Sequence, residues 1–133
     1  MKNHYLTIIG AVLSLQAGAV YAYGSSSSSS SCDKPSFSEF QPAANKYLQS
    51  FREFSFVASS NTTPGSITVN IGAGPLKEHF DAKQLQITPQ NSGRLVVKGK
   101  LSRPFQHGFA RISVTAHSKP GCEKTDGQLI RVQ

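Results

Sequence analysis

Hydrophobic and polar residues alternate with a period of two along most of the chain from Phe37 onward. In one segment, Phe54, Phe56 and Ala58 alternate with polar or charged neighbours. Because successive side chains of a β-strand point to opposite faces, this period predicts half-buried strands. The segments with this pattern are 37–40, 53–59, 66–71, 85–87, 95–101, 110–116 and 129–132.

Turn-forming residues such as glycine, proline and asparagine separate these segments. They lie at Asn61 to Gly65, Pro89 to Gly93, Lys119 to Gly121 and Asp126-Gly127. About seven short antiparallel strands in roughly 100 residues are typical of an immunoglobulin-like sandwich, so the predicted fold class is all-β. The inward positions of the central strands give the predicted core, which consists of Phe54, Phe56, Ile67, Val69, Ile112 and Val114.

The segment from Pro75 to Gln84 departs from this alternation. A proline near its start and two apolar residues four apart, Leu76 and Phe80, are typical of a short helix or helical turn. An irregular crossing between two sheets accounts for the same residues. The sequence leaves both alternatives open.

Three groups of residues carry a family resemblance that covers the chain from Cys32 to Gln133. They are Pro35-Ser36-Phe37 with Phe40 and Pro42, Glu53-Phe54-Ser55-Phe56, and Gly108-Phe109-Ala110-Arg111-Ile112 with Cys122 and Asp126-Gly127. In these residues the chain resembles small exported immunoglobulin-like domains of Gram-negative bacteria. The resemblance implies an adhesion, carrier or accessory module, and it implies no catalytic residue.

Copper carriers are one family of such sandwiches. They use a histidine at or near the mature N-terminus and, in many members, methionines. The expected mature chain begins with Tyr23-Gly24, and Met1 is the only methionine. Both departures argue against copper carriage.

Residues 1–22 have the features of a cleaved secretory leader. A basic start with Lys2 precedes a mostly apolar run from Leu6 to Leu15. Val20-Tyr21-Ala22 then places small residues at the positions that signal peptidase reads. We therefore expect a periplasmic or secreted protein with no transmembrane segment after the leader is removed. Residues 23–31 follow as a serine-rich tail, which has no apolar surface to bury and is predicted to be flexible.

The sequence contains two cysteines, Cys32 and Cys122. In an oxidising compartment an even pair is most simply a disulfide, and the spacing excludes a Cys-x-x-Cys motif. The closed loop contains about 90 residues, for which the chain-entropy model gives roughly 4–5 kcal/mol of stabilisation. The sequence therefore predicts a structural disulfide within a sandwich domain at 32–133.

The chain has a formal net charge of +7, from 14 Lys and Arg against 7 Asp and Glu. Positive residues are concentrated, without an intervening acidic residue, at Arg94, Lys98, Lys100 and Arg103. In an extended segment Lys98 and Lys100 share one face, which predicts a surface for an anionic partner such as an acidic polysaccharide or lipopolysaccharide. The alternative is that the lysines protect an exposed strand edge from aggregation. Export and the lack of a recognition motif argue against nucleic acid as a partner.

Three histidines outside the leader have no recognised ligand spacing: His79, His107 and His117. Side chains from different loops could still converge on Zn²⁺ or Cu²⁺, and Asp81 beside His79 could complete such a site. Surface histidines without a metal are the alternative.

The sequence contains no complete catalytic motif. Serines are abundant, but no Gly-x-Ser-x-Gly turn presents a nucleophile. The predicted function is an exported, non-enzymatic binding or accessory module of the cell envelope that needs no cofactor. Its expected partner is an envelope protein or an anionic polysaccharide. The alternative function is a small periplasmic metal-binding protein that uses His79, His107 or His117.

Overall fold

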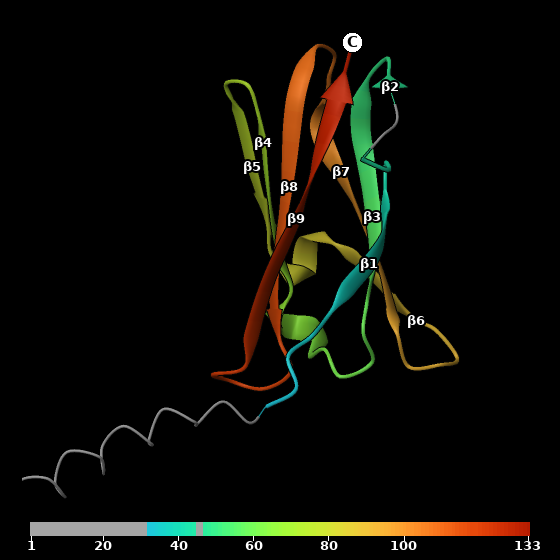
Figure 1. Ribbon diagram of the computed structural model, residues 1–133, viewed down its shortest axis with the longest axis vertical. Coiled ribbons are helices and arrows are strands. Elements are labelled where there is room, and N and C mark those ends of the chain that lie inside the picture. Colours follow the sequence, from blue (N-terminus) through green and yellow to red (C-terminus); the bar gives the residue numbers. More distant parts are fainter. Residues whose placement is uncertain (1–31, 45–46) are drawn as a thin grey trace, which may run out of the picture. The chain divides into compact units, whose positions relative to one another are not determined.

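The computed structural model of the chain describes residues 32–44 and 47–133. The predicted leader, 1–22, and the serine-rich tail, 23–31, lie outside these residues. In the described part, two β-sheets pack against each other, and two 3₁₀ turns, η3 (Pro64–Ser66) and η4 (Ala82–Gln84), lie between strands (Figure 1). No helix in these segments is long and apolar enough to cross a membrane.

The strands divide into a four-stranded and a five-stranded sheet. In spatial order, the four-stranded sheet contains β1 (Phe37–Gln41), β3 (Phe51–Ala58), β7 (Leu95–Phe105) and β6 (Gln86–Pro89). The five-stranded sheet contains β2 (Tyr47–Leu48), β9 (Glu123–Val132), β8 (Gly108–His117), β4 (Thr68–Ala73) and β5 (Leu76–Phe80). Paired strands are antiparallel, except that β2 pairs with β9 in parallel through two residues. The predicted all-β sandwich is confirmed.

The core lies between the sheets and is filled by the inward side chains of both. All six predicted core residues are buried, with no more than 3% exposure. Phe56 packs edge-on against Phe37 with ring centroids 5.9 Å apart, and it stacks on Phe40 at 5.5 Å. The period of two therefore predicted correctly which side chains form this layer.

Gly99 of β7 makes room for an aromatic ring of the neighbouring strand. Gly99 and Phe54 are partners in the β3–β7 register, and a Cβ on Gly99 would lie 2.2 Å from Cζ of Phe54. The Phe54 ring meets Phe80 of the other sheet edge-to-face, with centroids 5.3 Å apart. Any side chain at Gly99 would displace this contact between the sheets.

The described residues form nine strands, so the predicted number of about seven is too low. The largest difference is in β9, where the sequence predicted a turn at Asp126-Gly127 before a short last strand. Instead, β9 pairs with β8 along its whole length. A Cβ on Gly127 would lie 2.7 Å from the carbonyl oxygen of Ile112, so this glycine permits a close approach of two backbones.

Neither prediction for the segment from Pro75 to Gln84 is right for its first half. Leu76–Phe80 is the strand β5, and the helical turn is limited to Ala82–Gln84. Residues four apart share a face in a strand as well as in a helix, so the spacing of Leu76 and Phe80 does not distinguish them. All of β5 pairs with β4, and this pairing makes the segment a strand.

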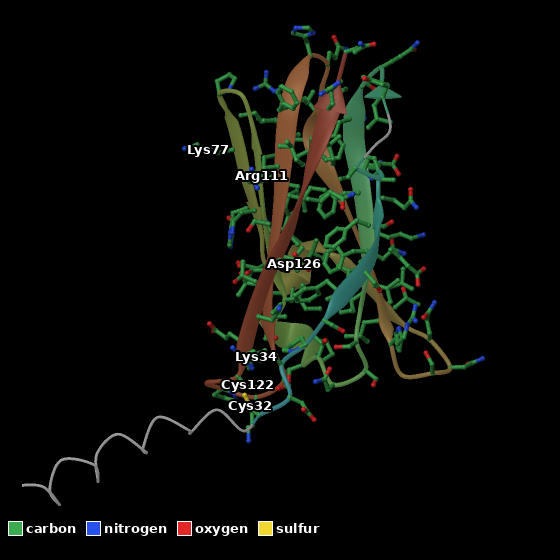
Figure 2. The ribbon with its side chains drawn as sticks, in the orientation of Figure 1. Cys32, Lys34, Lys77, Arg111, Cys122 and Asp126 are labelled. Atoms are coloured by element: carbon green, nitrogen blue, oxygen red, sulfur yellow. The ribbon has the colours of Figure 1, made fainter. Side chains whose placement is uncertain are left out.

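Cys32 and Cys122 form the predicted disulfide, and Figure 2 shows their side chains together at one end of the sandwich. Cys122 is fully buried and precedes β9 directly. Beside the bond, the carbonyl oxygen of Asp33 accepts hydrogen bonds from the Asn61 amide at 3.0 Å and from the Ser118 hydroxyl at 2.7 Å. The disulfide and these hydrogen bonds tie the start of the domain to two loops. Such a bond fits an exported protein.

Candidate functional site

Two of the predicted basic residues of β7, Lys98 and Lys100, lie on the outer side of the four-stranded sheet. Arg103 has the phase of the buried Leu101 instead, and it lines a hollow with Ala73 and Leu76 of the other sheet. Lys98 and Lys100 are exposed, whereas Leu95, Val97 and Leu101 alternate with them and are buried. The predicted orientation of the strand is therefore confirmed. We call the surface formed by Glu53, Ser55, Lys98 and Lys100 the β3–β7 face.

Carboxylates from other strands accompany the positive charges of this region. Nη2 of Arg94 donates a hydrogen bond to Oε2 of Glu39 at 2.7 Å. Glu53 of β3 is the register partner of Lys100. No acidic residue lies between Arg94 and Arg103 in sequence, but sheet pairing brings two close to them in space. The basic stripe is thus partly neutralised, and its binding of an anionic partner stays a prediction.

The edge of β7 near Arg103 is protected by groups other than the lysines. β6 pairs with β7 only as far as Lys98, so the second half of β7 has no strand partner on that side among the described residues. There, the backbone N–H and the hydroxyl of Ser102 both donate to Oε2 of Glu78, at 3.0 and 2.9 Å. Two residues further along, Pro104 has no N–H to offer. Glu78 and Pro104 therefore block strand addition here.

The outer side of the five-stranded sheet carries the large exposed hydrophobic side chains of the described residues. Tyr47, Phe109 and Leu129 are 64, 54 and 44% exposed. Each belongs to a different strand, and in register Arg131 of β9 lies between Tyr47 of β2 and Phe109 of β8. Uncovered hydrophobic side chains gathered on one face are typical of an interaction surface.

Arg131 holds the two exposed rings in place. Its Cζ lies 5.3 Å from the ring centroid of Tyr47 and 5.5 Å from that of Phe109, so the guanidinium makes a cation–π contact with each ring. Nη1 of Arg131 also donates a hydrogen bond to the Tyr47 hydroxyl at 2.9 Å. Arg131 therefore contacts both rings in the absence of a partner.

A second set of register partners lies on the same surface, next to Tyr47, Arg131 and Phe109. Leu129, Arg111, Gly72 and Lys77 are successive register partners on β9, β8, β4 and β5. Figure 2 labels Lys77 and Arg111 on this side of the sandwich. The ion pairs within the described residues include neither these two cations nor Arg131. We call this surface the β8–β9 face, and it consists of Tyr47, Lys77, Phe109, Arg111, Leu129 and Arg131.

The three candidate metal-ligating histidines do not converge. His107 precedes β8 and His117 ends it, so about 30 Å of extended strand separates them. His79 of β5 lies beside Asp81 as predicted, with Nε2 2.8 Å from its Oδ1, and Nδ1 lies 2.7 Å from Oδ1 of Asn70. The described residues contain no group of three His, Cys, Asp or Glu side chains that could hold a metal ion.

Sequence reasoning missed the β8–β9 face, although its signal was present. Phe109 and Leu129 occupy outward-facing positions of their strands, as Arg111 and Arg131 do. An outward position of a half-buried strand is normally polar, so two large apolar residues there are an anomaly.

No protein-family model matches the sequence, and no curated protein matches it significantly. Among solved structures, the fold is similar to that of PcoC, a methionine-rich copper resistance protein from Escherichia coli. The two share 15% sequence identity with a TM-score of 0.50, over 76% of this chain and 100% of PcoC. Likeness at this identity shows a common fold only.

Proposed function

We propose that the protein is an exported, non-enzymatic binding or accessory module of the cell envelope, and that its β8–β9 face contacts an anionic partner. The observation that carries the proposal is that three uncovered hydrophobic side chains share one surface with three cations that form no ion pair within the described residues. Tyrosine and arginine are enriched among the residues that dominate binding energy at interfaces.

Export is supported by two independent features. The first 22 residues have the pattern of a secretory leader. The Cys32–Cys122 disulfide belongs to an oxidising compartment. In such a compartment, anionic polymers and envelope proteins are the available partners, and a positively charged face attracts both.

A binding role accounts for the polar groups better than catalysis does. The carboxylate of Glu78 accepts hydrogen bonds from Ser102, and the ring of His79 contacts Asn70 and Asp81. These groups are hydrogen-bonded to one another, and the proposal assigns them no reaction. The metal-binding alternative has less support, because the candidate histidines belong to separate parts of the fold.

Co-sedimentation of the exported protein with cell envelopes isolated from a Gram-negative bacterium tests the proposal. The Arg111→Glu/Arg131→Glu variant should bind at least about tenfold more weakly at low salt, because it reverses the two arginine charges of the β8–β9 face. The matched control is Lys98→Glu/Lys100→Glu on the β3–β7 face, which changes the net charge by the same amount and should bind within about twofold of the parent. Equal losses in both variants would mean that only total charge matters, and undiminished binding by the arginine variant would contradict the proposal.

A further inference from the structure

Gly72 leaves a gap in the β8–β9 face that the fold itself does not need. Nothing lies within 4 Å of the place where a Cβ on Gly72 would be. Gly99 and Gly127 differ, because each makes room for Phe54 or for the β8 backbone. A glycine inside a strand weakens it, and one cause of its presence is the close approach of a ligand.

A shallow hollow of about 240 Å³ lies at this gap, and Lys77 is among the residues that line it. In register, Gly72 lies between Arg111 of β8 and Lys77 of β5. The hollow is lined by Asn70, Ile71, Gly72, Lys77, Glu78 and His79. Glu78 is the acidic residue of this lining, and its carboxylate is already hydrogen-bonded to Ser102. The hollow therefore offers positive charge to a group that enters it.

We propose that this hollow receives an acidic group of a polysaccharide chain, and this inference rests on the proposed function. Arg111 and Lys77 flank the acidic group on opposite sides, and the planar guanidinium of an arginine matches a carboxylate with two parallel hydrogen bonds. In the neighbouring set of register partners, Phe109 and Tyr47 provide exposed rings beside Arg131, and the apolar C–H face of a sugar ring packs on such a surface.

The hollow favours a polysaccharide over an anionic membrane. A fluid membrane surface attracts basic residues through net charge and does not need a fixed position for one acidic group. A hollow floored by the backbone at Gly72 provides such a position, with a cation on each side of it in register. An extended chain that crosses the sheet from β5 toward β9 would pass β4 and β8 in turn.

The Gly72→Val variant tests the proposal, because it fills the hollow without changing any charge. The probe is an oligogalacturonate, a chain of carboxylate-bearing sugars, and affinity is measured by isothermal titration calorimetry at low salt. The parent should bind it, and Gly72→Val should bind at least tenfold more weakly while it unfolds at the same or a slightly higher urea concentration. The matched control is Gly65→Val, since Gly65 lies in η3 and likewise has nothing within 4 Å of its Cβ position. Lys77→Gln, an exposed change, provides a second variant with an expected loss should Gly72→Val not fold.

Each remaining outcome has one meaning. Neutral dextran should not bind. Undiminished binding of oligogalacturonate by Gly72→Val would overturn the hollow as its site. Binding of phosphatidylglycerol vesicles without binding of oligogalacturonate would overturn the polysaccharide in favour of a membrane. If envelope binding depends on Arg111 and Arg131 but not on Gly72, the hollow fails and the proposed function stands. If envelope binding ignores the two arginines, the proposed function fails as well.

Discussion

The two outer faces of the sandwich are both exposed and both carry basic residues, but they differ in what surrounds those residues. On the β3–β7 face, Lys100 is paired in register with Glu53, and Arg94 nearby forms an ion pair with Glu39. On the β8–β9 face, the register partners of Arg111 and Arg131 are not acidic, and uncovered apolar side chains lie beside them. Within the described residues, neither these arginines nor Lys98 and Lys100 form an ion pair. Positive charge alone therefore does not identify a binding surface. The difference lies in whether the fold already provides the counter-charge.

The two sheets also use glycine differently. Gly99 of the four-stranded sheet faces the core, where its missing side chain is replaced by the ring of Phe54. Gly72 of the five-stranded sheet faces solvent, where nothing replaces the missing side chain. One glycine therefore serves packing, and the other leaves surface open for a partner.

Truncation of an aromatic side chain should give the largest difference in unfolding free energy between a core position and a position on the β8–β9 face. Phe56→Ala should lower the free energy of unfolding by about 3–5 kcal/mol, because it leaves a cavity between Phe37 and Phe40. Phe109→Ala, on the exposed β8–β9 face, should change it by less than about 1 kcal/mol. Urea denaturation followed by circular dichroism measures both. A similar loss in the two variants would place Phe109 in the core as well.

Replacement of Gly99 or Gly72 by valine should give the next largest difference in stability. Gly99→Val should destabilise by about 1–3 kcal/mol or more, because its side chain overlaps the ring of Phe54. Gly72→Val should be neutral or slightly stabilising, since the space is open and β-branched residues suit strands. Thermal unfolding of the two variants provides the comparison. A destabilised Gly72→Val protein would show that the hollow has a structural purpose.

Removal of single arginines should give the smallest contrast in stability. Arg94→Ala should lower the free energy of unfolding by about 0.2–1 kcal/mol, because both side chains of the Arg94–Glu39 ion pair are exposed. Arg111→Ala breaks no ion pair of the described residues and should leave stability unchanged, but it should weaken envelope binding. Urea denaturation and co-sedimentation separate the two effects. Weaker binding by Arg94→Ala than by Arg111→Ala would reverse the assignment of the faces.

The sequence predicted the sandwich and its core well because both depend on a local pattern. A period of two decides which of two faces each side chain of a strand takes, and Phe54, Phe56 and Ile112 follow it. The disulfide was predictable because the expected export leaves two cysteines few other roles. In contrast, β5 was missed because residues four apart share a face in both a helix and a strand, so only pairing with β4 distinguishes them.

The candidate site was predicted less well because it depends on neighbours that are distant in sequence. Glu39 meets Arg94 only through the packing of the fold, and Glu53 meets Lys100 only through the pairing of β3 with β7. The β8–β9 face combines residues of β2, β5, β8 and β9, and their register is not visible along the chain. The outward phase of Phe109 was the local signal that could have located this face.

Lysine labelling tests most directly which face meets the partner. Lys77 lies on the β8–β9 face, whereas Lys98 and Lys100 lie on the β3–β7 face, and all three are exposed. An amine-acetylating reagent applied with and without bound cell envelopes, followed by mass spectrometry of peptides, gives the protection of each lysine. We expect acetylation of Lys77 to slow on binding while Lys98 and Lys100 react as in the free protein. Protection of Lys98 and Lys100 with an unprotected Lys77 would contradict the account.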